Sequence, residues 1–234
     1  MVEGGLAPTR SKAVHLIKTG NVLVNGREVR RQSHEVGPGD RIELREGFRY
    51  VGRGGYKLEA FAAAAGLGCA GARVLDVGCS TGGFTDFFIQ HGAASVVALD
   101  VGEDVLDAHL RADPRVEFVG GVDVTDAAAL SRRLGGRRFD IVSVDVSNVP
   151  LEAALSAVAP LVEPSGGAVV ALFKPAYEGA RGPVRGEKAR ALADAFEARV
   201  SAAFEVLRRE ASALRGGSKG TGTVEVFFLL RPRG

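Results

Sequence analysis

Cysteine is scarce in this chain, and its scarcity excludes two kinds of site. The 234 residues of the chain include only two cysteines, Cys69 and Cys79, with one methionine and no tryptophan. Two cysteines at this spacing cannot build a disulfide framework or a cysteine-ligated metal site. We therefore expect two free thiols and no bound metal.

Long hydrophobic runs are missing as well. No uninterrupted apolar run approaches the roughly 20 residues that a membrane-spanning helix needs, and the first residues, MVEGGLAPTR, lack a signal-peptide pattern. Nor does the sequence contain a strongly basic amphipathic helix of the kind that lies on a membrane surface. These absences predict a cytoplasmic protein with no membrane partner.

The net charge is small but unevenly distributed. It is +2 overall, yet residues 1–60 hold 11 Lys and Arg against 7 Asp and Glu, while the rest holds 19 against 21. A basic head on a nearly neutral body indicates a polyanionic partner. Excesses of this size also arise by chance, so the charge is a hint that other features must support.

The first 46 residues predict a small α+β unit. PTRSKAVHLIKTG reads as a helix with Thr9 as N-cap and Gly20 as its stop. NVLVNGREV follows as a hairpin turning at Asn25-Gly26, and VGPGDRIEL adds a turn and a strand. The core of such a unit is very small and would be marginal on its own. Residues 47–53 read as a linker.

From residue 54 onward, apolar strands alternate with helical stretches. Strands are predicted at 72–78, 95–101, 116–121, 139–146 and 167–173, and a last strand lies in TVEVFFLLRP near the C-terminus. Helices are predicted before the first strand and near 83–91, 103–111, 125–133, 151–162 and 186–203. This alternation predicts an α/β fold with a doubly wound, parallel sheet.

A glycine-rich turn lies between the first strand and the next helix, in VLDVGCSTGGFTDFF. Gly78, Gly82 and Gly83 allow a ligand to approach the backbone closely. Their spacing is not the dinucleotide-binding fingerprint. Asp76, at the end of the strand, suits a ligand with an ammonium or sulfonium group better than a pyrophosphate.

Two further acids follow the next strands. Asp100 comes about 20 residues after the glycine turn, where a carboxylate can bind ribose hydroxyls, and Asp123 follows the third strand. Together the acids and the turn describe a nucleoside ligand without phosphates, and S-adenosylmethionine fits best. The alternative is a structural glycine turn with acids on the surface.

Four other charged residues stand out at element ends. Asp145 ends the fourth strand and Lys174 ends the fifth, GGAVVALFKPAYE. We expect these two strands to be neighbours or near-neighbours that flank the point where strand order reverses, so that the two charges meet. Lys57 begins the helix before the first strand, and Glu225 interrupts the apolar last strand. Each alone reads as a solvated side chain; their combination is what suggests a site.

Several of these motifs resemble the TlyA-type ribosomal RNA 2′-O-methyltransferases, which are related to the FtsJ (RrmJ) methyltransferases. They are RGGYKL, DVGCSTGGFTDFF, DVGEDVLD, VDVSNV, FKPAYE and VEVFFLL, in the family's order. The resemblance implies a Rossmann-like class I methyltransferase whose last strand is antiparallel, over residues 54–234. It also implies that the family's catalytic Lys–Asp–Lys–Glu tetrad corresponds to Lys57, Asp145, Lys174 and Glu225.

The resemblance extends to the cofactor and to the N-terminal segment. It implies S-adenosylmethionine bound by Asp76, Gly78, Ser80, Thr81, Gly82, Gly83, Phe84, Asp100, Val101, Asp123, Val124 and Asp145. GLAPTRSKAVHLIKTGNVLVNGREV resembles the RNA-binding domain named after ribosomal protein S-four, assigned to residues 1–46. The implied partner is ribosomal RNA or a ribosomal subunit, gripped at its phosphates by Arg10, Lys12, Lys18, Arg27, Arg30 and Arg31.

The chemistry of the tetrad follows from the substrate. A ribose 2′-hydroxyl is a poor nucleophile at neutral pH, so it needs help to lose its proton. We expect Lys174 to deprotonate or polarise the hydroxyl while Asp145 and Lys57 position it, in an aligned transfer that requires no metal.

The chain departs from the family in places, and alternatives remain open. VSNV stands where relatives have an LSFI-like stretch, and the segment after KPAYE is shorter than in relatives. The chain also starts almost at GGLAPTR, so we expect the small domain to lack the first element that relatives have. These changes affect substrate choice more than reaction type. The alternatives are a catalytically inactive RNA-binding or ribosome-associated protein, a methyltransferase with another substrate on the same fold, and a membrane-acting haemolysin, a label that TlyA relatives carry.

Overall fold

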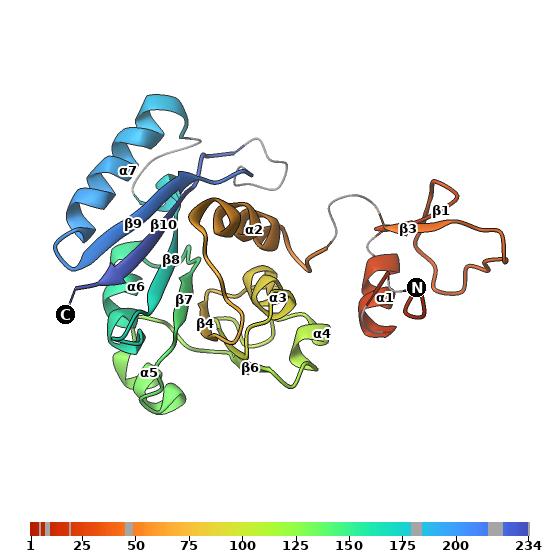
Figure 1. Cartoon of the computed structure of the whole chain (residues 1–234), viewed down its shortest axis with the longest axis horizontal. Helices are drawn as coiled ribbons and strands as arrows, with labels where there is room; N and C mark the ends of the chain where they lie inside the picture. Colours follow the sequence, from red (N-terminus) through yellow and green to blue (C-terminus); the bar gives the residue numbers. More distant parts are fainter. Residues whose placement is uncertain are drawn as a thin grey trace.

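The computed structural model of the chain is drawn in Figure 1. It describes residues 1–4, 6–7, 10–18, 20–44, 49–178, 184–214 and 222–233. Thr9, the expected N-cap of the first helix, lies outside the described residues, and so do the side chains of Lys12 and Lys18.

The N-terminal segment forms one helix and a small antiparallel sheet. Its elements are α1 (Arg10–Lys18), β1 (Val22–Val24), β2 (Arg27–Val29) and β3 (Ile42–Leu44). The strand order is β2-β1-β3, with both neighbours antiparallel to β1. Asn25 and Gly26 both adopt positive φ angles of 52° and 76°, as a tight two-residue hairpin requires. Among the described residues, the buried cluster of this segment consists of Ala7, Ala13, Leu16 and Val22, in agreement with the small core expected from the sequence.

The remainder of the chain builds a seven-stranded sheet with helices on both faces (Figure 1). Its strands are β4 (Arg73–Val77), β5 (Ser95–Leu99), β6 (Val116–Val119), β7 (Ile141–Val144), β8 (Ala168–Phe173), β9 (Phe204–Ala211) and β10 (Val226–Pro232). Its helices are α2 (Arg53–Ala65), α3 (Gly83–Gln90), α4 (Ala108–Arg111), α5 (Ala127–Leu134), α6 (Leu151–Val158) and α7 (Gly186–Val200), with two short 3-10 helices, η1 (Ala159–Leu161) and η2 (Pro175–Tyr177).

The strand order in this sheet is β6-β5-β4-β7-β8-β10-β9. Strands β4 to β8 are mutually parallel, while β10 runs antiparallel to both β8 and β9. The α/β fold and the antiparallel last strand expected from the sequence are therefore confirmed.

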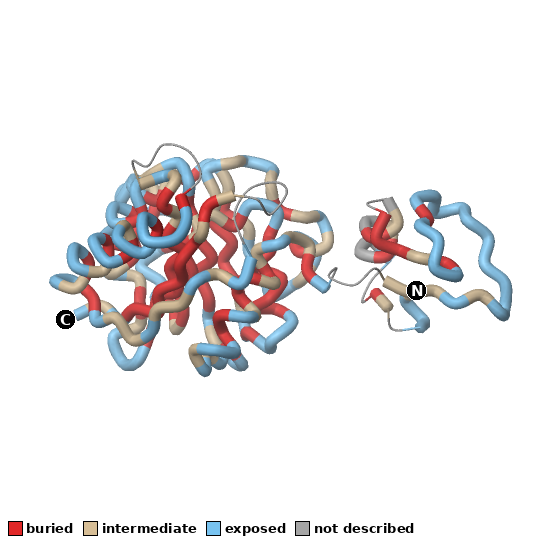
Figure 2. Tube along the Cα trace, turned by 90° about the horizontal axis from the view of Figure 1, so that it is seen from above, coloured by how far each residue is buried: buried red, intermediate tan, exposed pale blue. Residues whose placement is uncertain are grey.

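Two apolar layers cover the two faces of the sheet. Helices α5, α6 and α7 pack over one face against residues such as Leu75 and Val142. Helices α2 and α3 pack over the other, against residues such as Val74 and Ile141. Figure 2 shows the strands as a continuous buried centre. Neighbouring positions along one strand thus point into different cores, which explains why these strands are apolar runs rather than alternating ones.

The prediction from the sequence did not include strand β9, and it made the helix around α4 too long. β9, whose sequence is FEVLRREA, was not predicted because it is an edge strand with Phe204 as its one buried residue. The helix expected at 103–111 is helical only over α4, which begins where the Asp107 side chain accepts a hydrogen bond from His109 N. The preceding residues instead form a turn, in which Gly102 N donates to the Asp100 carboxylate.

The reversal of strand order also lies one strand from its expected place. β7 and β8 are neighbours, as predicted, but the order reverses between β4 and β7 rather than between β7 and β8. The crevice at this reversal is therefore bordered by the turn after β4 and by the residues after β7.

Candidate active site

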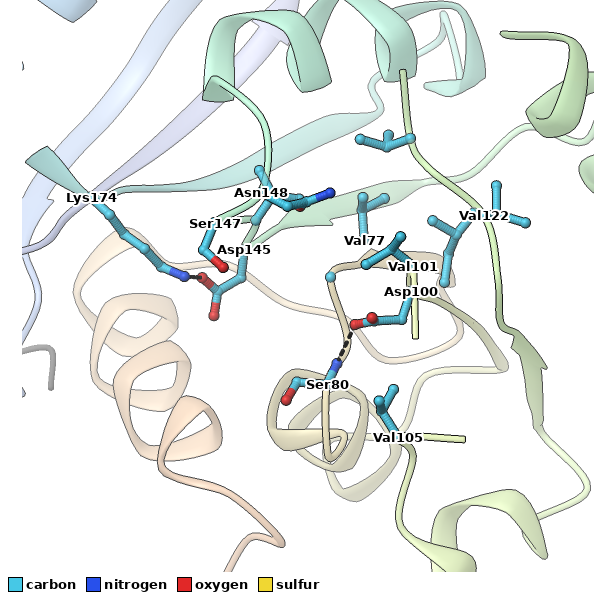
Figure 3. A pocket seen from close by; sticks show the side chains of 14 residues that line it. Val77, Ser80, Asp100, Val101, Val105, Val122, Asp145, Ser147, Asn148 and Lys174 are labelled. Atoms are coloured by element: carbon cyan, nitrogen blue, oxygen red, sulfur yellow. Dashed lines mark hydrogen bonds and ion pairs between the residues drawn. The ribbon is translucent and has the colours of Figure 1, made fainter. Parts of the chain in front are cut away.

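A cavity of about 340 Å³ opens at the carboxyl ends of the parallel strands (Figure 3). Its apolar lining consists of Val77, Leu99, Val101, Val105, Val122, Val124 and Val146. Its other lining residues are Gly78, Ser80, Asp100, Asp145, Ser147, Asn148 and Lys174. The charged groups of this lining are thus two carboxylates and one ammonium. The valine side chains form an apolar surface that a flat apolar ligand can contact.

Asp100 joins the two turns that form one side of the cavity. One carboxylate oxygen accepts a hydrogen bond from Ser80 N at 2.8 Å, and the other accepts from Gly102 N at 2.8 Å. Figure 3 shows the first of these bonds directly. A carboxylate has about four acceptor positions, so Asp100 can still accept hydrogen bonds from a ligand.

Gly78 keeps the turn after β4 close to the end of β7. Its φ is +79°, and a Cβ added at this position would stand 2.6 Å from the backbone oxygen of Asp145. Only glycine satisfies both the angle and the approach without strain. The close contact sets the width of the crevice at the point where strand order reverses.

Lys174 and Asp145 form an ion pair at the edge of the cavity. Lys174 Nζ lies 2.5 Å from Asp145 Oδ1, and the two side chains are 15% and 23% exposed. The approach does not have hydrogen-bond geometry, so the buried Oδ1 atom has no hydrogen-bond donor among the described residues. The Lys174 ammonium is the charged group that compensates this buried oxygen.

Lys57 and Glu225 form a second, more deeply buried ion pair. Lys57 Nζ donates to Glu225 Oε2 at 2.5 Å, and the side chains are 10% and 8% exposed. Glu225 immediately precedes β10, whose Val226 is paired with Phe173 of β8. Lys174 immediately follows Phe173, so the antiparallel register brings Glu225 and Lys174 to the same end of adjacent strands. The structure thereby brings Lys57, Asp145, Lys174 and Glu225, the four residues expected from the sequence, to the end of the sheet where the parallel strands have their carboxyl ends.

Asp76, an expected cofactor residue, does not line the cavity. Its side chain is fully buried and accepts hydrogen bonds from Thr85 Oγ1 at 2.6 Å and Ser143 Oγ at 2.8 Å. Burial raises the pKa of this carboxyl to about 6, against the opposing effect of the two hydroxyl donors. In this structure Asp76 therefore ties β4 to α3 and β7 instead of facing a ligand.

Other expected cofactor residues also lie outside the lining. Phe84 is buried and its ring lies 6.0 Å from that of Phe227, while the Asp123 carboxylate accepts from the backbone N and the hydroxyl of Thr125. A Cβ at Gly82 would meet Leu106 and Leu110, and one at Gly83 would meet the backbone of α2. Thr81 and Asp123 are absent from the lining as well. Of the expected set, the lining contains Gly78, Ser80, Asp100, Val101, Val124 and Asp145.

Sequence reasoning missed two polar lining residues, Ser147 and Asn148. They lie two and three residues after Asp145, beyond the carboxyl end of β7. The rule that ligands bind beyond the carboxyl ends of parallel strands could have found them.

The arginines expected to contact RNA are exposed in the N-terminal segment. Arg10 begins α1, and Arg27 and Arg31 are exposed on and after β2. Arg30 is exposed too, but its guanidinium is paired with Glu28. The backbones of Lys12 and Lys18 lie in α1.

Within the described ranges, no group of three or more His, Cys, Asp or Glu side chains could hold a metal ion. No helix in the same part of the chain is long and apolar enough to cross a membrane. Cys69 and Cys79 are buried free thiols, and burial raises the pKa of both.

Comparison with known families decides what kind of protein carries this site. The model of FtsJ-like methyltransferases matches residues 50–221, and that of the S4 domain matches residues 1–42. The chain belongs to the FtsJ-like methyltransferase family. Among its relatives is Hemolysin A of Brachyspira hyodysenteriae, 37% identical over 77% of this chain and 74% of that protein.

A second relative and a solved structure support the same grouping. The 16S/23S rRNA (cytidine-2′-O)-methyltransferase TlyA of Mycobacterium tuberculosis is 35% identical over 79% of this chain and 68% of its own. The solved structure of a putative hemolysin from Streptococcus thermophilus superposes with a TM-score of 0.72 and 31% identity, covering 97% of this chain and 85% of that one. The FtsJ-like methyltransferase domain and the S4 domain thus occur together here, as the sequence motifs indicated.

Proposed function

We propose that this FtsJ-like methyltransferase transfers a methyl group from S-adenosylmethionine to a ribose 2′-hydroxyl of ribosomal RNA. The observation that carries the proposal is the pairing of Lys174 with Asp145, beside the buried pair of Lys57 and Glu225, at the edge of a nucleoside-sized cavity. The name of the mycobacterial relative, an rRNA (cytidine-2′-O)-methyltransferase, supports the choice of acceptor.

The cavity lining fits the cofactor. S-Adenosylmethionine carries a sulfonium, an ammonium and a carboxylate, which together give a net positive charge. The lining carries two carboxylates against one ammonium, so its net charge is of the opposite sign. Asp100 would accept from the ribose hydroxyls, the valines would contact the adenine, and Gly78 would let the ligand approach the backbone. The bound cofactor would supply an activated methyl group attached to a sulfonium.

The Lys174–Asp145 pair prepares the acceptor. In the transfer, a bond forms between O2′ and the methyl carbon, the bond between that carbon and sulfur breaks, and O2′ loses its proton. Asp145 lines the cavity beside Lys174, so its carboxylate can accept a hydrogen bond from the hydroxyl. Lys174 Nζ, which lies 2.5 Å from Asp145 Oδ1, would polarise O2′. The proton that O2′ loses would be taken up by the Asp145 carboxylate, either directly or through Lys174 as that ammonium passes a proton to Asp145.

Lys57 and Glu225 act as positioning residues in this account. Their ion pair links α2 to the start of β10, and Glu225 lies at the end of the strand next to Lys174. Holding O2′ in line with the methyl group is the main contribution that a protein makes to this transfer. A rigid, buried pair next to Lys174 serves that alignment.

The chemical identity of the methylated nucleoside tests the proposed function. Purified protein would be incubated with ribosomal subunits that lack the modification and with methyl-labelled S-adenosylmethionine, and the RNA would be digested to nucleosides and analysed by mass spectrometry. The proposal predicts a 2′-O-methylnucleoside. A base-methylated nucleoside would contradict the choice of acceptor, and RNA binding without any transfer would indicate an RNA-binding protein that lacks activity.

A further inference from the structure

Tyr177 is an exposed aromatic side chain next to the Lys174–Asp145 pair. Its exposure is 59%, whereas that of Tyr50 is 2%. No other aromatic side chain in the described part of the chain is exposed to this degree. Exposed aromatic side chains are the platforms on which proteins stack the bases of single-stranded nucleic acids.

The backbone beneath Tyr177 is fixed from two directions. Tyr177 ends the short helix η2, and its N donates to Lys174 O at 2.9 Å. Glu178 Oε1 accepts a hydrogen bond from Leu151 N at 2.9 Å, which ties the residue after Tyr177 to the start of α6. Pro175, at the start of η2, is buried. The backbone that carries the ring is thus already ordered, so only the side-chain torsions of Tyr177 remain to be fixed when a ligand binds.

The ring also lies at the right place for a nucleotide. Lys174 Nζ is 2.5 Å from Asp145 Oδ1 and 5.8 Å from the centroid of the Tyr177 ring. In a nucleotide, the base and the 2′-hydroxyl are attached to neighbouring ribose carbons. A ribose whose hydroxyl contacts Lys174 and Asp145 therefore has its own base within reach of Tyr177.

We propose that Tyr177 stacks on the base of the nucleotide that is methylated, and so selects a nucleotide turned out of the RNA helix. The inference rests on the proposed function, because it places the ribose at Lys174. Paired bases in an RNA helix have no free face, so stacking on a protein ring requires an unpaired or extruded base. Every base has such a face, so this contact recognises the extruded state rather than base identity.

A purely structural role for Tyr177 predicts different behaviour. If the ring only shields the Lys174 ammonium, its loss changes kcat and the pH–rate profile and leaves the KM for RNA unaltered. If the ring binds the base, its loss acts on the KM for RNA and on kcat/KM, and a phenylalanine replaces it without loss. The hydroxyl is not needed for stacking, which makes the Tyr177→Phe variant a matched control.

Kinetics of the Tyr177→Phe and Tyr177→Leu variants of the full chain test the inference on ribosomal subunits. We expect Tyr177→Phe to stay within about twofold of the wild-type kcat/KM and Tyr177→Leu to lose about 10- to 100-fold. Binding of S-adenosylmethionine, measured by calorimetry, should be equal in all three. Wild-type turnover in Tyr177→Leu, or an equal loss in both variants, would overturn the proposal. So would a loss confined to kcat with an altered pH profile.

Tyrosine fluorescence separates this inference from the proposed function, since it needs no turnover. The chain has no tryptophan and three tyrosines, of which Tyr177 is exposed. A single-stranded oligocytidylate is the probe, and anisotropy of a labelled copy reports its saturation independently. We expect saturation to quench wild-type emission and to leave the emission of Tyr177→Leu nearly constant. Equal quenching in both proteins would contradict stacking, whatever the wild-type methylation assay shows.

Discussion

The two ion pairs at the edge of the sheet differ in burial. Lys57 and Glu225 are 10% and 8% exposed, whereas Lys174 and Asp145 are 15% and 23% exposed and line the cavity. A buried pair is not a strong source of stability, but removing one partner leaves an uncompensated charge. The more exposed pair is the one that a substrate can reach. Stability and catalysis can therefore be tested separately.

Replacing Lys57 with methionine should destabilise the fold. The variant leaves the Glu225 carboxylate buried without its partner, and we expect a loss of about 3–5 kcal/mol in the free energy of unfolding. Urea denaturation followed by circular dichroism measures this. In the matched double variant Lys57→Met/Glu225→Leu, most of the stability should return while methyl transfer stays impaired. A double variant with full activity would contradict a positioning role for the pair.

Asp76 should make stability depend on pH. Burial raises its pKa from 3.8 to about 6, so between these values the folded protein holds a proton that the unfolded chain has lost. Its contribution to stability is full below about pH 4 and is lost as the pH rises through 6. Relative to Asp76→Asn, the wild type should lose about 1–3 kcal/mol between pH 4 and pH 7. Parallel denaturation profiles for the two proteins would contradict this account.

The identity of the charged residues at the site could be predicted from the sequence, whereas the directions of their side chains could not. Lys57, Asp145, Lys174 and Glu225 interrupt or end apolar elements, so they stand out in the sequence. Asp76 stood out equally, yet its carboxylate turns toward Thr85 and Ser143. A residue's place at the end of a strand indicates the edge that it occupies, whereas its side-chain direction depends on hydroxyl groups contributed by other elements.

Among the elements, the turn between β4 and α3 depends most on glycine. Gly78 adopts a φ of +79° and lies against the backbone that follows β7. The adjoining helix α3 packs closely on α2, since a Cβ at Gly83 would stand 3.1 Å from Gly55 N. The turn is therefore held from both sides, and the cavity wall is rigid there.

Gly78→Ala should weaken cofactor binding by more than about tenfold. Its Cβ would force the turn away from Asp145 O, 2.6 Å away, and widen the crevice. Calorimetry with S-adenosylmethionine measures the effect. Gly71→Ala is the matched control, because its φ is +75° and nothing lies within 4 Å of its Cβ. Equal losses in both variants would show that backbone strain alone accounts for the effect.

The parallel strands of the sheet were predictable because they are buried on both faces and appear as apolar runs. β9 was not, since its one buried residue is Phe204 and its centre carries Arg208 and Arg209. The helix expected over 103–111 begins only at Ala108, and the reason is local. Asp100 and Asp107 bind nearby backbone N–H groups and hold the chain in a turn, in place of the first helical residues.

At the scale of the whole molecule, the excess of basic residues lies toward the N-terminus, where residues 1–60 hold 11 Lys and Arg against 7 Asp and Glu while the rest of the chain holds 19 against 21. The exposed arginines of the N-terminal segment include Arg27 and Arg31, and the domain model that matches residues 1–42 is that of the S4 domain. Contacts between arginines and phosphates supply affinity and register without reading sequence. On this account, the N-terminal segment would hold the RNA while the cavity edge selects one ribose.

Affinity for ribosomal RNA should fall steeply with salt. The double variant Arg27→Gln/Arg31→Gln removes two phosphate contacts and should reduce the slope of log K against log salt by about 2. Filter binding at several salt concentrations measures the slope. The matched control is Arg132→Gln/Arg133→Gln in the last turn of α5, which should leave it unchanged. If the slope of log K against log salt were equal for all three proteins, the assignment of the phosphate contacts to the N-terminal segment would be contradicted.

Lys174→Ala tests the central claim most directly. Transfer of labelled methyl groups to ribosomal subunits would be measured beside calorimetric binding of S-adenosylmethionine, with the exposed Lys188→Ala on α7 as control. The account predicts that Lys174→Ala binds the cofactor within about threefold of wild type and transfers methyl groups at least about 100-fold more slowly. Lys188→Ala should match the wild type. Near-normal transfer by Lys174→Ala would contradict the account.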